Sequence, residues 1–322
     1  LSVAPSVAAV SGVLGLVGGT VGATVGTKVV SLSSANSNGG ISVHWVRQIP
    51  SLHAVVFLPG WLPDHHGDGG EIVSCGDEAV RAVGAYGDIG LAVWDETKMR
   101  ELGKAMVASL PNLATELSQQ VASRIMPRAL HLTTLWPGKL DHTSIVDAPW
   151  AMLRGTTDSS AAQILVDAIV NSQMAGTRPL TLVGIGLGAR LIFNALLLLC
   201  TSTTSNIDEN RGLVENVVFL GAAIPTGWMQ QWRAVRSVVP GRFINCYCPT
   251  DSLLRVASHA ELLETPSEPA GLMPIILGTS PEVSGDEIEN HDVTSLNNFM
   301  VRTLLDYQSP GVLQAIFNLL KL

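Results

Sequence analysis

Residues 179–190 read PLTLVGIGLGAR, an apolar run rich in β-forming residues that leads into closely spaced glycines. A helix-like run over residues 187–200 follows directly. A strand, a sharp turn and a helix in this order form a nucleophile elbow, whose G-x-S-x-G motif presents a serine hydroxyl for acyl transfer. The middle position here is Gly186. The segment therefore predicts an elbow that lacks its nucleophile.

The same glycines also match the G-x-G-x-x-[GA] fingerprint of dinucleotide-binding loops, through Gly184, Gly186 and Ala189. That fingerprint needs an acidic residue at the end of the next strand, where it binds the ribose. The next apolar run ends in FLGAAIP, residues 219–225, which contains no acid. We therefore expect no dinucleotide and no other cofactor.

An elbow of a working hydrolase faces backbone N–H groups that stabilise the oxyanion of the tetrahedral intermediate. The run VFLPGWL, residues 56–62, reads as a strand that ends in a turn. It predicts an oxyanion region formed by Gly60 and Trp61 together with the backbone N–H of Leu187.

The remaining parts of a hydrolase triad follow the nucleophile in the order acid, then histidine. Asp251 comes after a predicted strand at residues 242–247 and is the candidate acid. Downstream of Asp251 the chain holds only His259 and His291. Neither histidine has an obvious place in the expected order of strands and helices. The triad therefore lacks an evident base as well as its nucleophile.

Three stretches carry a resemblance to a known family. They read LTLVGIGLGARLIFNAL, VENVVFLGAAIPTGWMQQWRAVRSVVPGRFINCYCPTDSLLR and IENHDVTSL. The chain resembles the transmembrane and coiled-coil domain-containing protein 4 family, which has an α/β-hydrolase fold and is associated with membranes. The similarity extends upstream through LPGWL and LAVWDETKMRELGKAM, so it covers nearly the whole chain.

The resemblance implies which triad members this chain retains. Members of the family typically carry G-F-S-L-G-A-R, so their serine corresponds to Gly186. Their acid corresponds to Asp251, and an ungapped extension from Ile288 places their histidine at Met300. We therefore expect no catalytic residue: a vestigial triad remains, with Met300 as an apolar filler and Asp251 capping a turn.

A second candidate site is the polar run DHHGDGGE over residues 64–71. His65, His66 and Asp68 offer ligand atoms that a transition metal could use. Two adjacent histidines in a glycine-rich loop lack the i, i+4 spacing that places two ligands on one helix face. We therefore expect a solvated loop and no bound metal.

The composition indicates a protein that contacts membranes. Apolar residues make up 47% of the chain and charged residues 14%, with a net charge of −8. Scattered basic residues in an acidic chain exclude a nucleic-acid-binding surface. Residues 1–27 carry no charge and contain small-xxx-small spacings such as Gly18/Gly22. We expect this segment to contact membrane lipid, although a glycine-rich core or flexible segment has the same composition.

Apolar strands alternate with helical patterns along the rest of the chain, which predicts a doubly wound, mostly parallel α/β sheet of the α/β-hydrolase type. We expect residues 1–40 to form the hydrophobic segment and a linker, and residues 41–322 to form one hydrolase-like domain. The expected strands are residues 53–59, 89–94, 180–183, 214–220, 242–247 and 273–277. The expected helices are residues 98–127, kinked at Pro111, and residues 159–173, 187–200, 228–235, 295–305 and 310–320.

These observations together predict a catalytically inactive hydrolase relative that serves as a structural or accessory subunit of a membrane-associated protein complex. Its expected partners are other protein subunits and lipid. An intracellular membrane, such as the mitochondrial inner membrane, is the expected location. Two alternatives stay open: an active lipase or esterase with an unrecognised nucleophile, and a module that binds a lipid or small ligand in the emptied pocket.

Overall fold

The computed structural model describes residues 28–33, 40–47, 51–63, 87–115 and 145–321. Within the last range it omits residues 159, 172–173, 175, 177, 202–211, 260, 262–266, 279–286, 297–298 and 310. The predicted membrane-contacting segment, residues 1–27, and the polar run at residues 64–71 lie outside the described residues.

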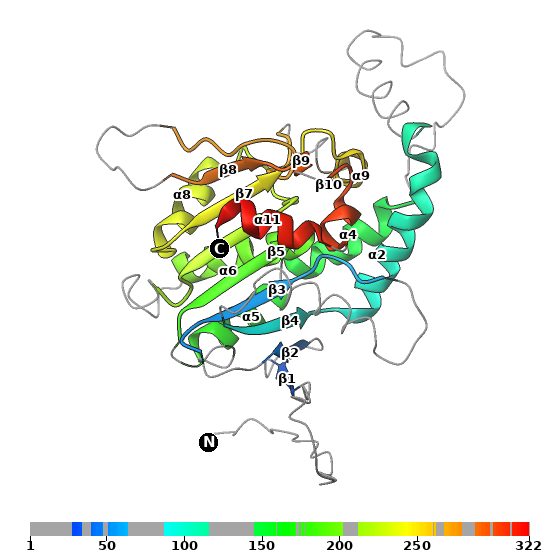
Figure 1. The fold of residues 1–322 in the computed structure, drawn as a ribbon. Coiled ribbons are helices and arrows are strands. Elements are labelled where there is room, and N and C mark those ends of the chain that lie inside the picture. Colours follow the sequence, from blue (N-terminus) through cyan, green and yellow to red (C-terminus); the bar gives the residue numbers. More distant parts are fainter. Residues whose placement is uncertain are drawn as a thin grey trace, which may run out of the picture.

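The described residues build one large twisted sheet with helices on both faces (Figure 1). The sheet has eight strands in the order β1-β2-β4-β3-β5-β6-β7-β8. Strand β2 runs antiparallel to β1 and β4, and the six strands from β4 to β8 run parallel. The strands are β1 (Lys28–Ser33), β2 (Gly40–Arg47), β3 (Ala54–Leu58), β4 (Asp88–Val93), β5 (Leu180–Ile185), β6 (Asn216–Leu220), β7 (Phe243–Tyr247) and β8 (Glu289–Asp292).

Aromatic contacts show how both faces of the sheet are covered. On one face Phe57 of β3 stacks on Phe317 of the last helix, with ring centroids 5.9 Å apart. On the other, Trp232 packs edge-on against Phe219 of β6 and Phe243 of β7. The helices are α2 (Glu96–Ser109), α4 (Asp147–Thr157), α5 (Ser160–Val170), α6 (Leu187–Thr201), α8 (Met229–Val238), α9 (Ser252–Ala257) and α11 (Val312–Leu320).

The burial pattern explains why these runs became central strands. Every residue of β3, β4 and β5 is buried. A strand covered by helices on both faces has no solvent side, so it reads as a continuous apolar run instead of an alternating one. The strand order, the antiparallel β2 and this burial together confirm the prediction of a doubly wound, mostly parallel sheet with the α/β-hydrolase arrangement.

Several predicted boundaries are wrong. Strand β1 pairs with β2 from Lys28 onward, so the sheet begins before residue 41, where we placed the start of the domain. Residues 273–277 form no strand, because the side chain of Asn290 bonds both the backbone N–H and the carbonyl of Ile275. The edge strand is β8 instead.

The predicted helix over residues 295–305 is also wrong. This stretch holds two short paired strands, β9 (Ser295–Leu296) and β10 (Phe299–Met300). They lead into the 3-10 helix η2 (Leu304–Gln308). A capping box fixes the start of η2, because the Asp306 side chain accepts the backbone N–H of Thr303 while the Thr303 side chain caps in return.

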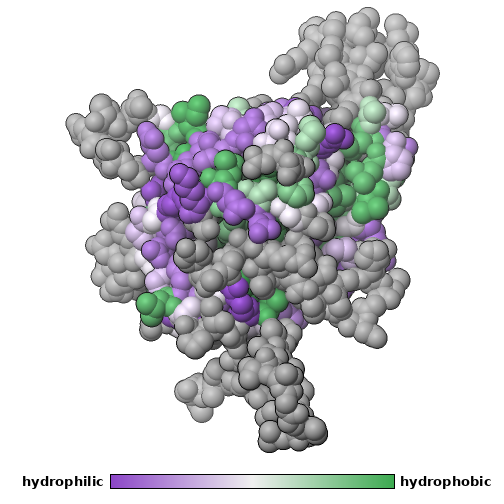
Figure 2. All heavy atoms as spheres, viewed as in Figure 1, coloured by the Kyte–Doolittle hydropathy of each residue, from purple (hydrophilic) through white to green (hydrophobic). Residues whose placement is uncertain are grey.

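The surface of the described residues is mixed. Figure 2 shows hydrophobic side chains gathered over the carboxyl end of α2, among otherwise polar neighbours. Val107 of α2 and Met152 of the adjacent helix α4 are 57% and 54% exposed. Within the described part of the chain, no helix is both long enough and apolar enough to cross a bilayer.

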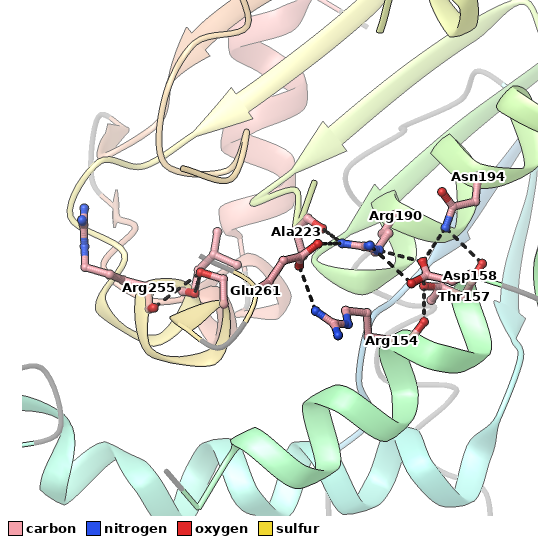
Figure 3. A network of polar contacts seen from close by, with 10 residues as sticks. Arg154, Thr157, Asp158, Arg190, Asn194, Ala223, Arg255 and Glu261 are labelled. Atoms are coloured by element: carbon pink, nitrogen blue, oxygen red, sulfur yellow. Dashed lines mark hydrogen bonds and ion pairs between the residues drawn. The ribbon is translucent and has the colours of Figure 1, made fainter. Parts of the chain in front are cut away.

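A buried arginine ties together the segments around the carboxyl edge of the sheet (Figure 3). Arg190 of α6 is 4% exposed and donates to Asp158, which follows α4, and to Glu261, which follows α9. It also donates to the carbonyl of Ala223 after β6 and lies 5.2 Å from the ring centroid of Trp228. One side chain thus links four separate segments.

We expect the substitution Arg190→Met to lower the free energy of unfolding by about 3 kcal/mol, because it leaves the buried Glu261 carboxylate without its main partner. The measurement is urea unfolding followed by circular dichroism. The control is Arg255→Met, which breaks a half-exposed pair with Glu268 and should change stability by about 0–1 kcal/mol. Equal losses in the two variants would contradict a structural role for the network.

Candidate functional site: a hydrolase elbow without a nucleophile

Gly186 stands at the turn between β5 and α6, in the middle of the sheet's carboxyl edge. Its φ of +59° lies in the left-handed region, which costs a non-glycine residue on the order of 1–3 kcal/mol. Its N–H donates to the carbonyl of Leu220 at 3.0 Å, and its carbonyl accepts the N–H of Ala223 at 3.3 Å. The strand, turn and helix therefore have the conformation of a nucleophile elbow.

The glycines on either side of Gly186 allow the close packing that an elbow needs. A Cβ atom at Gly188 would lie 1.8 Å from the carbonyl oxygen of Leu58, at the end of β3. A Cβ atom at Gly184 would lie 2.4 Å from the Cα of Ala189. Both distances are far below contact, so neither position accepts a side chain without moving α6.

The three residues predicted for the oxyanion region come together beside the elbow. A Cβ atom at Gly60 would lie 2.6 Å from the backbone nitrogen of Leu187. Trp61 is 2% exposed, and its ring would be 3.4 Å from a Cβ atom at residue 186. The carbonyl of Trp61 accepts a hydrogen bond from Gln308 at 3.3 Å, which attaches this turn to η2.

Asp251 lies beyond the end of β7, where the sequence predicts the acid. It is fully buried, and one carboxylate oxygen caps α9 by accepting the N–H of Leu254 at 2.8 Å. Burial raises the pKa of Asp251 to about 7, although the backbone N–H groups of Leu254, Leu304 and Leu253 act in the opposite direction. Asp251 therefore caps a helix, where the sequence predicted the cap of a turn.

The residue next to both the elbow and the acid is Leu304, which the sequence did not single out. Its two methyl groups would lie 3.2 and 3.4 Å from a Cβ atom at residue 186, and its backbone N–H interacts with the Asp251 carboxylate. Leu304 is completely buried. An apolar residue in a short 3-10 helix gives no signal in a sequence that it occupies a catalytic region.

Met300 does not fill the site as an apolar residue, contrary to our expectation. It lies on β10, is 54% exposed, and its sulfur accepts a hydrogen bond from Arg302. The expectation depended on an ungapped extension from Ile288. The structure shows a tight hairpin, β9–β10, in this stretch, where a change of length between relatives would shift every later position.

Neither downstream histidine is among the atoms nearest to the tip of the elbow. His291 lies on β8, with β6 and β7 between it and β5, and pairs with Glu289 at 3.8 Å. His259 is buried just beyond α9. The three atoms nearest to a Cβ atom at residue 186 are two of Leu304 and one of Trp61, and none of them belongs to a titratable side chain.

The space opened by the missing serine is occupied. Atoms of Leu304 and Trp61 lie 3.2–3.4 Å from the position of its Cβ atom, slightly closer than or at ordinary van der Waals contact. These residues therefore do not form a pocket emptied by the change from serine to glycine.

The metal candidates His65, His66 and Asp68 lie outside the described residues, and the described residues contain no cluster of metal ligands.

Stability should depend on pH through Asp251. Because the pKa in the folded state, about 7, exceeds the ordinary value of 3.8, the unfolded state loses this proton first. The free energy of unfolding should fall as pH rises from about 4 to about 7, by at most about 4 kcal/mol. Asp251→Asn should remove this part of the pH dependence in urea unfolding. Glu287→Gln, at an exposed position, is the control and should keep it.

Several known proteins are similar to this chain in sequence. The chain is 37% identical over 185 residues to the transmembrane and coiled-coil domain-containing protein STS1 of Oryza sativa subsp. japonica, covering 57% of this chain and 25% of that protein. It is 30% identical over 209 residues to the probable lipase MIL1 of Saccharomyces cerevisiae, covering 65% of this chain and 18% of that protein. The chain thus spans a quarter or less of the length of these two relatives.

Among solved structures, a dienelactone hydrolase from Anabaena variabilis aligns with 92% of this chain and 94% of its own, at 12% identity and a TM-score of 0.39. A model of one protein family matches residues 2–322, almost the full sequence. The chain therefore belongs to the family described as protein of unknown function DUF726.

Proposed function

We propose that this chain is a catalytically inactive α/β-hydrolase relative that acts as a structural or accessory subunit of a membrane-associated protein complex. The observation that carries the proposal is Gly186 at the tip of a well-formed elbow. Acyl transfer by this fold needs a nucleophilic atom at that position. Glycine offers none, and Leu304 beside it offers neither a nucleophile nor a base.

The state of the acid supports the same proposal. In a working triad the carboxylate is ionised and stabilises the imidazolium that forms during the reaction. Asp251 instead has a pKa raised to about 7 by burial, and its hydrogen bond to Leu254 serves helix α9. A residue can keep such a capping role after catalysis has been lost.

The membrane part of the proposal comes from the relatives. The rice relative is named a transmembrane protein, and an uncharacterised relative from Caenorhabditis elegans, 34% identical over 163 residues, is named a membrane protein. We propose that this chain likewise works at an intracellular membrane, such as the mitochondrial inner membrane. Residues 1–27 would contact lipid there, and the hydrolase-like unit would bind other subunits.

A lipase or esterase activity is the second candidate, and the name of the yeast relative, a probable lipase, favours it. It would require a nucleophile other than residue 186. A binding module for a lipid or small ligand is supported less well, because Leu304 and Trp61 occupy the space beside Gly186.

The test of inactivity is labelling with a fluorophosphonate, followed by intact-mass analysis. This reagent forms a stable adduct with an activated serine. We expect no adduct on the wild-type chain under conditions that label a commercial serine hydrolase to completion. A stoichiometric adduct would overturn the proposal of inactivity, and peptide mapping would then identify the nucleophile.

The test of the accessory role is the size of the native particle. The protein is extracted from its own membranes with a mild detergent, and co-purifying chains are identified by mass spectrometry. We expect a defined assembly much larger than a single copy of the protein, whose mass denaturing electrophoresis of the same sample provides. A monomer without partners, in the absence of any fluorophosphonate adduct, would contradict the accessory role while leaving the inactivity intact.

A further inference from the structure

We infer that Leu304, and not Met300, stands where the base of a working hydrolase would stand, and that the lost histidine left an unpaired acceptor on Asp251. The inference rests on the proposed loss of catalysis. In a triad the base contacts the nucleophile through one ring nitrogen and the acid through the other. Among the described residues, Leu304 lies at both positions: its side chain reaches residue 186, and its backbone N–H is near enough to the Asp251 carboxylate to lower the pKa of that group.

The second carboxylate oxygen of Asp251 is independent support. Oδ1 accepts the N–H of Leu254, whereas Oδ2 is buried and accepts no hydrogen bond of ordinary length and angle within the described part of the chain, although the backbone N–H of Leu304 lies near enough to lower the pKa of this carboxyl. Leaving a buried acceptor unpaired is costly, so such atoms are rare in native structures. An imidazole N–H from position 304 would satisfy this oxygen, and a leucine side chain cannot.

The backbone of residue 304 is held by groups other than its own side chain. Asp306 accepts the N–H groups of both Arg302 and Thr303, and Gln308 donates to the carbonyl of Trp61. The ring of Tyr307 packs against Gly221, where a Cβ atom would lie 2.7 Å from it. A substitution at residue 304 should therefore keep the backbone in place beside the elbow.

Met300 fails the same geometric requirement. More than half of its side chain is exposed, and it contacts Arg302 through its sulfur. A histidine there would face solvent, where it could not bridge two buried positions. The two positions lie four residues apart in the chain but differ in burial, which makes them a matched pair for an experiment.

The experiment attempts to rebuild the site in the full chain. Three variants are compared: Gly186→Ser, Gly186→Ser with Leu304→His, and Gly186→Ser with Met300→His. Folding of each is verified by circular dichroism, and fluorophosphonate labelling is followed by intact mass. We expect the Leu304→His combination to label at least about 100-fold faster than the other two, because a positioned general base contributes roughly 10²–10⁴-fold.

The single variant Leu304→His supplies a readout that needs no activity. Its imidazole should pair with Asp251, so the fall in stability between about pH 4 and pH 7 should shrink, whereas Met300→His should leave that fall unchanged. The inference is overturned if the folded Leu304→His double variant labels no faster than the Met300→His double variant. If the double variants do not fold, an unchanged pH profile of Leu304→His overturns it. Labelling of the wild-type chain would contradict the proposed function and not this assignment.

Discussion

The crossing of helix α6 over the end of strand β3 is the contact on which the rest of the structure depends. At Gly188 the helix approaches the Leu58 carbonyl so closely that no side chain fits between them. This contact brings the Gly60–Trp61 turn against Leu187 and sets the position of Gly186. It also directs Arg190, two residues further along the helix, toward the polar and aromatic contacts that tie four segments together. Fold and site therefore share one packing constraint.

The glycines that satisfy this constraint are present, whereas residue 186 carries no side chain. Gly184, Gly188 and Gly60 serve packing, and any side chain there would collide with backbone atoms. Residue 186 holds the turn through its backbone hydrogen bonds and is the position from which a nucleophilic side chain would project, and there the chain has glycine at φ +59°. The neighbouring residues have structural roles: Leu304 is buried beside the elbow, and Asp251 caps helix α9. Packing therefore requires glycine at residues 60, 184 and 188, whichever residue occupies position 186.

How much of this the sequence could predict depends on the kind of residue concerned. The buried strands β3, β4 and β5 and the elbow were predictable, because continuous apolar runs and glycine spacing have direct structural causes. Strand β8, with the sequence ENHD, was not, because its partly exposed edge position allows polar residues. Helix α4 was also missed. Leu304 could not be predicted, since the hairpin that positions it depends on tertiary contacts of η2 with Trp61 and Gly221.

The relation between Gly186 and Leu304 has an evolutionary consequence. A serine restored at residue 186 would reintroduce backbone strain and press against the Leu304 methyl groups. A histidine restored at residue 304 would have no nucleophile to activate. The serine at residue 186 and the histidine at residue 304 would each bring a disadvantage or no benefit unless the other were already present. The two positions are therefore epistatic. Under the proposed loss of catalysis, packing of Leu304 against the elbow therefore opposes the return of a serine at residue 186.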